Sequence, residues 1–437
     1  MLLLTDFHRQ TASTVRDHID SFSTFSRHHF RRLSMYGDLP PRIDLSRFDG
    51  VVIHYTLIAC MDHYLSHSAR ARLRAFSGLK AMFIQDEYRF INRTVAAIRD
   101  LGIDLLFTCV PEPEIDKVYS PQALPRPVRV NVLTGYVPPT LALRAVPVPA
   151  DRPIDIGYRG RRLPAHLGRL SQEKSMIGEH VAAEAPRYGL VTDISCREED
   201  RIYGEEWINF ISRCKAMLGV ESGASVFDFT GEIERQVTDH LRREPDVSYE
   251  TLERLYLGAH EGKIRLNQIS PRCFEAAALR TLMILYEGEY SGILKPWHHY
   301  VPLKKDHSNM ADVVAVLRDP EQIAKITERA YREVALDARY SYASAVAQVD
   351  DAIDALIRPE MLARRRPYTN FGFRSARKID GLKLYRGLKY QALQMKYQAL
   401  QIARWLFLRV ALGWMPEQRR EKVWNRIREW RGIKPVG

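Results

Sequence analysis

The chain has 437 residues, of which 46% are hydrophobic and 27% are charged. These proportions are typical of a folded globular protein and exclude a disordered or collagen-like chain. The length is too great for one ordinary core, so we expect two domains with additional elements. The net charge of +12 is unevenly distributed, because residues 358–437 contain 20 Lys and Arg against 5 Asp and Glu. The rest of the chain is slightly acidic, which argues against a nucleic-acid-binding body.

The cysteines and the apolar segments indicate a cytoplasmic protein. Five cysteines are scattered without a C-x-x-C pair, as expected for reduced thiols. The N-terminal residues 1–6 lack a basic region, so we expect a first strand and no signal peptide there. The longest apolar stretch, residues 402–415, is short and contains two arginines, so it does not resemble a membrane span.

Short apolar runs alternate with helical patterns in the first third of the chain. Runs of this kind indicate strands that are buried on both faces of a parallel sheet. The predicted strands are Leu2–Leu4, Gly50–Ile53, Ala81–Ile84, Leu105–Thr108 and Val128–Leu133. The predicted helices are Thr11–Phe30, His67–Ser77 and Arg93–Leu101. This alternation predicts a doubly wound α/β domain over residues 1–145.

A proline-rich connection, Val137–Pro153, contains five prolines in 17 residues and is the best linker candidate. The pattern then restarts, which predicts a second α/β domain over residues 146–357. Its predicted strands are Ile154–Tyr158, Gly189–Thr192, Ala216–Val220, Ile264–Gln268 and Leu282–Tyr286. The helical segment Pro320–Leu356 is expected to close this second domain.

The basic C-terminal stretch, residues 358–437, has the composition of an amphipathic helical tail. Lysines and arginines alternate with large apolar residues over 375–431, which favours the surface of an anionic membrane. A helix packed on the body or a contact between subunits fits the same pattern. We therefore expect a cytoplasmic protein that is peripheral on the inner face of the membrane.

Three segments of the second half carry a family resemblance. They are Ile156-Gly-Tyr-Arg-Gly-Arg161, Leu218-Gly-Val-Glu-Ser-Gly-Ala-Ser-Val-Phe-Asp228 and Ile269-Ser-Pro-Arg-Cys-Phe-Glu-Ala-Ala-Ala-Leu279, the last continuing to Tyr286-Glu-Gly-Glu-Tyr-Ser-Gly292. The third resembles the donor-binding region of GT-B glycosyltransferases, especially the glycosyltransferase family 1 and spore-coat-maturation-like groups. The resemblance implies two Rossmann-like domains that face each other across a cleft, with a nucleotide-sugar site in the second.

The first of these segments has the residues that a diphosphate needs. A nucleoside diphosphate binds backbone N–H groups at a helix N-terminus, one or two cations, and a carboxylate on the ribose. Gly157 and Gly160 would let the backbone approach a phosphate closely. Arg159, Arg161 and Lys174 are the nearby cations. A tight turn with solvated arginines is the alternative interpretation.

Glu275 is expected to open a helix, and the resemblance implies that it holds the donor ribose. A carboxylate in a first helical turn is also favoured by the helix dipole alone. Many retaining GT-B enzymes have another Glu eight positions earlier, where this chain has Asn267, so the stereochemistry stays open. Arg272 is expected to bind phosphate or to pair with Glu275.

Further polar residues follow two predicted strands, where binding residues gather in open α/β sheets. Glu221 and Ser222 are expected to contact the base or the phosphates. The second group consists of Glu287, Gly288, Glu289, Tyr290, Ser291 and Gly292. We expect it to bind sugar hydroxyls and phosphate, and an ordinary polar turn is the alternative interpretation.

The first domain offers candidates for a general base, which transfer to a hydroxyl with inversion requires. They are His54, Asp86 and Glu87, each at the end of a predicted strand, and Asp86 is the preferred one. A helix cap or a buried histidine explains them equally simply. No Asp-x-Asp pair occurs at a plausible strand end, so we expect no metal, and no cofactor besides the nucleotide-sugar co-substrate.

These patterns predict a glycosyltransferase that moves a sugar from a nucleotide sugar to a hydroxyl. The expected acceptor is a glycan or lipid-linked glycan of a bacterial envelope, as in polysaccharide biosynthesis, and nucleic acid is not an expected partner. Two alternatives use the same fold: an epimerase or phosphorolytic enzyme, and a non-catalytic scaffold that docks on membranes.

Overall fold

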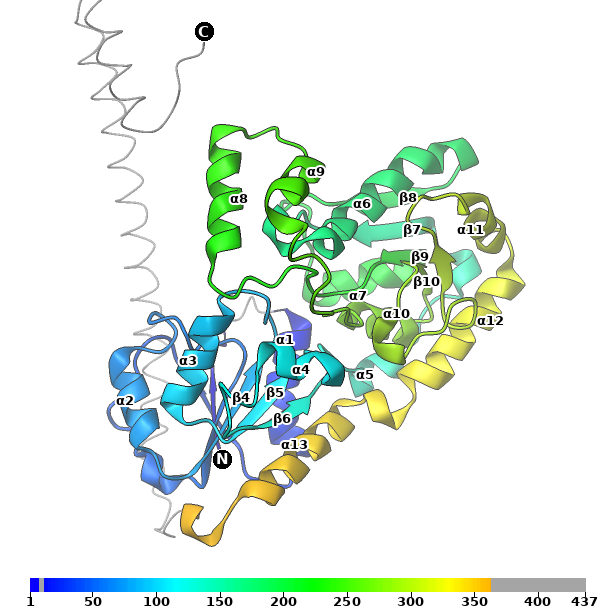
Figure 1. Ribbon diagram of the computed structural model, residues 1–437. Helices are drawn as coiled ribbons and strands as arrows, with labels where there is room; N and C mark the ends of the chain where they lie inside the picture. The colour runs from blue at the N-terminus through cyan, green and yellow to red at the C-terminus, as the bar shows by residue number, and fades with distance from the viewer. Residues whose placement is uncertain (8–11, 363–437) are drawn as a thin grey trace, which may run out of the picture. The chain divides into compact units, whose positions relative to one another are not determined.

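The computed structural model describes residues 1–7 and 12–362, and residues 8–11 and 363–437 lie outside this description. The expected membrane-binding tail therefore falls outside the described residues. The described part of the chain folds into two lobes, each with one parallel sheet flanked by helices (Figure 1). Among its helices, none combines the length and the apolar character that a membrane span needs.

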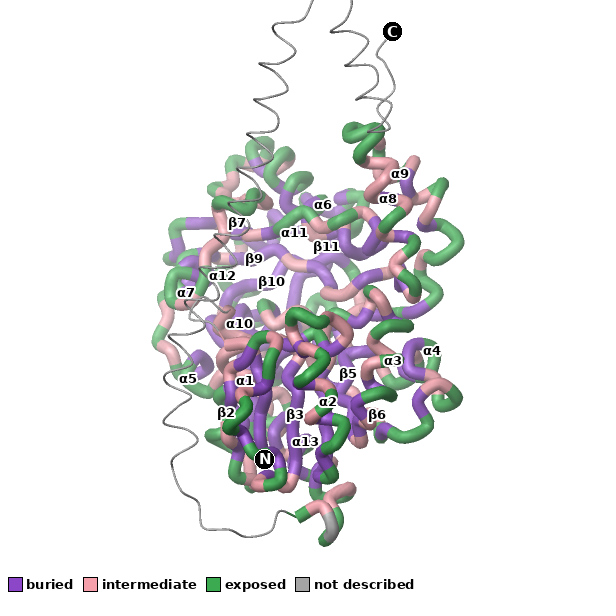
Figure 2. The backbone as a smooth tube through the Cα atoms, turned by 90° about the vertical axis from the view of Figure 1, so that its left-hand side faces the viewer, coloured by how far each residue is buried: buried purple, intermediate pink, exposed green. Residues whose placement is uncertain are grey.

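The first lobe contains a six-stranded parallel sheet in the order β2-β1-β3-β4-β5-β6. The strands are β1 (Leu2–Thr5), β2 (Arg31–Ser34), β3 (Gly50–Ile53), β4 (Leu79–Ile84), β5 (Leu105–Thr108) and β6 (Val128–Asn131). The helices are α1 (Ser13–Phe25), α2 (His67–Ala75), α3 (Ile91–Leu101), α4 (Glu112–Val118) and α5 (Pro139–Ala142). The residues of β1, β3 and β5 are all buried, which accounts for their uninterrupted apolar sequences (Figure 2).

The second lobe contains a five-stranded parallel sheet in the order β11-β10-β9-β7-β8. The strands are β7 (Ile154–Arg159), β8 (Thr192–Ser195), β9 (Cys214–Gly219), β10 (Leu282–Tyr286) and β11 (Val301–Leu303). The helices are α6 (Arg169–Glu184), α7 (Gly204–Arg213), α8 (Glu232–Arg243), α9 (Tyr249–Leu252), α10 (Pro271–Ala278), α11 (Met310–Leu317) and α12 (Pro320–Ala330). Successive residues of β9 pack into different clusters, Met217 on one face and Leu218 on the other.

The strand order creates a switch point in the second lobe. From β7 the chain first adds β8 on one side and then β9 on the other side. Helices that connect these strands lie on opposite faces of the sheet, so a crevice opens at the carboxyl ends of β7 and β9. Ligands of doubly wound sheets bind in this crevice. The glycine-arginine turn at residues 157–161 and the residues 220–222 both lie there.

The predicted fold class is confirmed, but several predicted elements are wrong. The segment 264–268 is not a strand, and of these residues Gln268 makes one isolated bridge, to Ser222. Strands β2 and β11 were not predicted, and β8 lies three residues later than expected. The predicted helix 11–30 ends at Phe25, and the extended strand β2 follows it.

The helical stretch 320–356 is divided between the lobes. Ile323 and Ile326 of α12 pack into a core cluster of the second sheet. The last helix, α13 (Tyr342–Leu356), instead buries Val346, Val349 and Ile353 in the core of the first lobe, beside α1 (Figure 1). The segment therefore does not close the second domain alone, and the described chain begins and ends in the first lobe.

Candidate functional site

A pocket with a volume of about 380 Å³ lies at the carboxyl ends of β7 and β9. Its walls come from the turn after β7, the end of β9, the start of α10, Lys174 of α6 and Trp207 of α7. The first lobe contributes Ala12, Ser13 and Thr14 at the start of α1. The pocket therefore occupies the switch point that the strand order creates.

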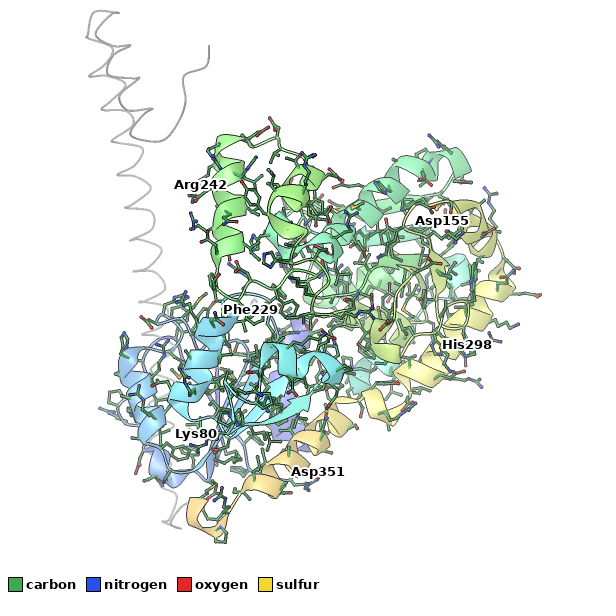
Figure 3. All side chains as sticks on the ribbon, viewed as in Figure 1. Lys80, Asp155, Phe229, Arg242, His298 and Asp351 are labelled. Atoms are coloured by element: carbon green, nitrogen blue, oxygen red, sulfur yellow. The ribbon has the colours of Figure 1, made fainter. Side chains whose placement is uncertain are left out.

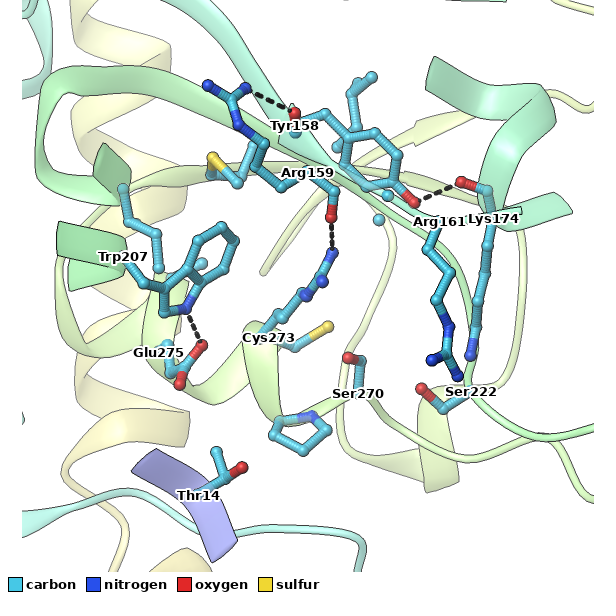
Figure 4. A pocket seen from close by; sticks show the side chains of 18 of the residues that line it. Thr14, Tyr158, Arg159, Arg161, Lys174, Trp207, Ser222, Ser270, Cys273 and Glu275 are labelled. Carbon is cyan, nitrogen blue, oxygen red and sulfur yellow. Dashed lines mark hydrogen bonds between the residues drawn. The ribbon is translucent and has the colours of Figure 1, made fainter. Parts of the chain in front are cut away.

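Three cations converge on this pocket. In Figure 4 the side chains of Arg161 and Lys174 lie side by side, close to Ser222. Arg272 lines the same pocket, and its charge and that of Arg161 lower the pKa of Lys174, although burial lowers it most, to about 8. Among the described residues, no carboxylate forms an ion pair with any of the three. Such an excess of positive charge is what a diphosphate would neutralise.

The N-terminus of α10 faces the same space. Ser270 precedes the helix, and Pro271 occupies its first position, where the missing N–H costs nothing. Neither Ser270 nor another side chain caps the helix, while Ser270, Pro271 and Arg272 all line the pocket. The partial positive charge of the helix N-terminus therefore adds to that of the three cations.

Glu275 lies on α10 at the opposite side of the pocket from Arg161 and Lys174 (Figure 4). It is buried, and the indole Nε1 of Trp207 donates a hydrogen bond of 2.7 Å to its carboxylate. Burial raises the pKa of Glu275 to about 7, against the opposing effects of the Trp207 hydrogen bond and the charge of Arg272. The pocket thus combines a carboxyl group and a cationic end, as a ribose diphosphate requires.

The other residues of the 157–161 turn have structural contacts. The guanidinium of Arg159 pairs with Asp193 at 2.8 Å and stacks 4.3 Å from the ring of Phe210. The backbone carbonyl of Arg159 accepts a hydrogen bond from Arg272. Arg159 therefore positions Arg272, and its own charge is already balanced.

The glycines of this turn serve close packing within the lobe. A Cβ at Gly157 would lie 2.3 Å from the Sγ of Cys214, and one at Gly160 would lie 2.6 Å from the ring of Tyr158. From the sequence, we expected these glycines to let the backbone approach a phosphate closely. The structure gives a different reason for glycine at these positions, because neighbouring side chains already occupy the space that a Cβ would need.

The acidic and glycine-rich group at 287–292 does not line the pocket. Glu287 and Glu289 are not buried in the lobe. Glu221 is buried and accepts hydrogen bonds from the backbone of this turn and from the side chain of Asn267. Ser222 does line the pocket. Of the two neighbouring candidates, Ser222 therefore faces the pocket, whereas Glu221 binds the backbone of the 287–292 segment.

The three first-lobe candidates lie in very different surroundings. Glu87 is buried and accepts hydrogen bonds from the Thr108 hydroxyl at 2.6 Å and the Cys109 amide at 2.9 Å. His54 is also buried, and its ring nitrogens contact His18 at 2.9 Å and Thr56 at 3.0 Å. Burial lowers the pKa of His54 well below its usual value. Both groups are buried and hydrogen-bonded within the first lobe, which leaves Asp86 as the exposed one of the three candidates.

Asp86 is exposed, and its carboxylate accepts a hydrogen bond of 3.1 Å from the hydroxyl of Tyr88. Its charge acts on Lys174, because it raises the pKa of that amine against the effect of burial. A carboxylate of the first lobe therefore lies within electrostatic range of the cationic end of the pocket.

Sequence reasoning missed Trp207, which lines the pocket, and Asp17, whose charge acts on Glu275. Trp207 is buried against Glu275, and the signal for it was the strongly amphipathic pattern of α7. Asp17 follows Thr14 by one helical turn on α1. Burial raises its pKa to about 6, and its charge raises the pKa of Glu275. No sequence pattern links Asp17 to Glu275, since they come from different lobes.

One further cluster has the donor atoms of a metal site. His298, labelled in Figure 3, and His299 both contact the carboxylate of Glu333 at 3.0–3.1 Å. However, the amide of Lys295 donates a hydrogen bond to Nδ1 of His299. Neutral His299 therefore carries its proton on Nε2 and donates it to Glu333. Hydrogen bonding accounts for this cluster.

Comparison with known proteins identifies the fold. Neither protein-family models nor curated sequences match this chain. Solved structures do match. An alpha-glucosyltransferase in complex with UDP and a 13-mer DNA has a TM-score of 0.50 and 8% identity, over 81% of this chain and 98% of that chain. An alpha-glucosyltransferase in complex with UDP-glucose and DNA has a TM-score of 0.51 and 9% identity over the same shares.

HepE of Anabaena in complex with UDP and glucose matches 81% of this chain and 99% of that chain, with a TM-score of 0.45 and 10% identity. At these identities the comparisons show the fold. The chain has the GT-B fold, with two parallel Rossmann-like sheets, as the sequence analysis predicted.

Proposed function

We propose that this protein is a glycosyltransferase that transfers a sugar from a nucleotide sugar to a hydroxyl acceptor. One observation carries the proposal. Arg161, Lys174 and Arg272 form an unbalanced cationic cluster at the N-terminus of α10, in the same pocket as the buried carboxyl of Glu275. A nucleoside diphosphate fits both the cationic cluster and the carboxyl group, because its phosphates neutralise the cations and its ribose hydroxyls donate to a carboxylate.

The same groups suit the chemistry of transfer. Breaking the bond between the sugar and the diphosphate leaves negative charge on the leaving phosphate. Fixed cations and a helix N-terminus that already point at this position stabilise that charge without rearrangement. We therefore propose that the three cations and the helix replace a divalent metal ion at the leaving group.

We propose Asp86 as the base that accepts the proton of the acceptor hydroxyl if the reaction inverts the sugar. It is the exposed carboxylate among the three strand-end candidates, and it lies within electrostatic range of Lys174. Replacement Asp86→Asn should lower kcat by about 100-fold or more while the affinity for the nucleotide changes little, since general-base catalysis typically contributes that much. Steady-state kinetics and calorimetry on the same variant would separate the two effects.

A binding screen tests the function directly. UDP, the ligand of the structurally similar glucosyltransferase, should raise the melting temperature of the protein in buffer containing EDTA, and GDP, ADP, CMP and dTDP serve as comparisons. A ligand at a hundredfold excess over its Kd stabilises by about 2.7 kcal/mol. Lys174→Ala and Glu275→Ala should abolish the shift, whereas Arg159→Ala should change the stability of the protein itself. If no nucleotide shifts the wild type, the proposal fails.

For the acceptor, we propose a hydroxyl of a glycan or lipid-linked glycan. The chain outside residues 358–437 has a slight excess of acidic residues, which disfavours a polyanionic acceptor. Transfer from a labelled nucleotide sugar should occur to glycolipids in vesicles that contain anionic lipid. Transfer to DNA instead would identify nucleic acid as the acceptor and overturn this part of the proposal.

A further inference from the structure

The carboxylate of Glu221 joins three segments of the second lobe. Glu221 lies just after the end of β9 at Gly219, and it is 6% exposed. One carboxylate oxygen accepts the backbone N–H of Glu289 at 3.1 Å and that of Tyr290 at 2.8 Å. The other oxygen accepts the side-chain amide of Asn267 at 2.7 Å. A buried charge with three donors is well satisfied, so this group is fixed in place.

The turn that Glu221 holds has an unfavourable backbone. Tyr290 and Ser291 have φ values of +45° and +56°, and Gly292 follows at +72°. A left-handed conformation is unfavourable for a non-glycine residue, so two in succession need support from their surroundings. The approach of Glu221 is close, because a Cβ at Gly288 would lie 2.7 Å from its carboxyl carbon. The glycine is therefore required for the carboxylate to reach the turn.

The same network continues to the wall of the pocket. Ser222 and Gln268 exchange two backbone hydrogen bonds of 2.7 and 2.8 Å. The hydroxyl of Ser291 accepts the N–H of Ile269 at 3.0 Å. Ser222 lines the pocket, and Ser270, which follows Ile269, lines it at the start of α10. The position of the helix N-terminus is thus set by contacts that originate at Glu221.

Asn267 lies eight positions before Glu275 in the sequence. In this structure its amide is the complement of the Glu221 carboxylate. A carboxylate at position 267 would place two negative charges about as close as this hydrogen bond in a buried site, which is strongly unfavourable. The absence of an acidic residue at 267 is therefore consistent with the presence of one at 221.

We infer that Glu221 is a positioning residue of the proposed donor site and that it requires a neutral hydrogen-bond donor at position 267. Through the 288–292 turn and the 267–270 segment it fixes Ser222 and the N-terminus of α10 against the diphosphate. This inference rests on the proposed function and adds to it the residue pair that builds the site.

Isosteric replacements test the pair, with UDP as the probe and isothermal titration calorimetry as the measurement. Asn267→Asp places a second carboxylate against Glu221 and should weaken UDP binding by about tenfold or more, since 1.4 kcal/mol corresponds to a factor of ten. The double variant Glu221→Gln with Asn267→Asp should bind within about threefold of the wild type. In the double variant, the new side-chain amide at position 221 donates to the new carboxylate at position 267. The amide oxygen at 221 still accepts from the backbone N–H groups of 289 and 290.

A pH series separates positioning from general damage. The weakening by Asn267→Asp, taken relative to the wild type at each pH, should shrink from pH 8 to pH 6 as the paired carboxylates take up a proton. The double variant should show no such trend. Glu232→Gln, which removes an exposed carboxylate of α8, is the matched control and should bind UDP like the wild type.

Two results would overturn the inference while leaving the proposed function intact. They are unchanged UDP affinity in Asn267→Asp, or a double variant that binds no better than Asn267→Asp although circular dichroism shows both folded. If the wild type itself binds no nucleoside diphosphate, the proposed function fails and the inference fails with it.

Discussion

The ionisable groups of the pocket predict how nucleotide affinity depends on pH. The pKa of Glu275 is raised to about 7, mainly by burial, and that of Lys174 is lowered to about 8. Ribose hydroxyls need the ionised carboxylate, and the diphosphate needs the ammonium. Affinity should therefore increase as pH rises through 7 and decrease as pH rises above 8. Calorimetry with a nucleotide sugar from pH 5.5 to 9.5 measures this curve.

The two limbs of that curve belong to different residues, so variants separate them. Glu275→Gln should remove the acidic limb, and Lys174→Arg should remove the alkaline limb because a guanidinium stays charged. An unchanged curve in Glu275→Gln would assign the acidic limb to another group.

Buried Glu87 predicts a pH dependence of stability rather than of binding. Burial raises its pKa to about 8, despite the hydrogen bonds from Thr108 and Cys109. The folded state therefore holds this proton more tightly than the unfolded state, and stability should fall as pH rises from about 4.5 to 8. In Glu87→Gln the fall in melting temperature between pH 6 and pH 8 should be smaller than in the wild type. An equal fall in both proteins would contradict this assignment.

At the scale of single residues, the chemistry of candidate side chains could be recognised from the sequence, but the residues that they contact could not. Arg161, Lys174, Arg272 and Glu275 were all proposed from the sequence, and the structure places all four in one pocket. The expectation that Glu275 opens a helix was wrong, because α10 begins at Pro271. Glu87 and Asp86 are neighbours in the sequence, yet one is buried and the other is exposed. That difference depends on Thr108 and Cys109, which lie more than 20 residues away.

At the scale of elements, the contact of α13 with the end of α1 predicts a large effect on stability, although no residue of α13 lines the pocket. Asp350 on this helix is fully buried and accepts the Ser26 hydroxyl at 2.6 Å and the Arg27 amide at 2.7 Å, just after α1. Asp350→Ala would remove both hydrogen bonds and should cost about 1–3 kcal/mol. Denaturant unfolding would measure the loss, and nucleotide affinity well below the melting temperature should not change.

Neighbouring Asp351 provides the matched control. Asp351, labelled in Figure 3, is exposed and forms an ion pair with Arg27. Asp351→Asn should therefore have little effect on stability, because exposed ion pairs contribute little. Equal losses in the two variants would show that surface charge, rather than the buried hydrogen bonds, connects α13 to α1.

Strands with continuous apolar sequences were mostly predictable, whereas the polar edge strand β2 was not. β3, β4 and β5 are largely apolar and were recognised. Edge strand β2 reads Arg31-Arg-Leu-Ser34 and has one buried residue, so its sequence resembles that of a surface helix. Residues 264–268 alternate like a strand, but they are held by Glu221 and Ser222 from the loop after β9. Tertiary contacts decided their conformation.

Contacts between the lobes predict a coupling across the whole molecule. Arg89 of the first lobe forms two hydrogen bonds, of 2.6 and 3.1 Å, to Glu234 on α8. Beside them the backbones of Tyr88 and Asp228, and of Asn92 and Phe229, are hydrogen-bonded. Arg89→Glu should lower the melting temperature by about 1–2 °C, as expected for a partly exposed pair. Adding Glu234→Arg should restore it.

That double-mutant cycle also has a clear negative outcome. If the loss of stability in the double variant equals the sum of the losses in the two single variants, the two side chains do not interact in solution. The sequence analysis assigned Asp86 and Glu87 to catalysis but gave no role to neighbouring Arg89. The partner of Arg89 on α8 is 145 residues away, so no local pattern could have shown that Arg89 joins the lobes.

The return of α13 to the first lobe means that the polypeptide passes between the lobes twice. The two passages touch, because the amide of Val137 donates to the carbonyl of Tyr340 at 2.8 Å and the hydroxyl of Tyr331 donates to the carbonyl of Ala142. Because hydrogen bonds hold the two passages together, any movement of one lobe relative to the other must bend both passages at the same place. Residues 363–437 follow α13 in the sequence, so a force applied to them reaches the first lobe before it reaches the second.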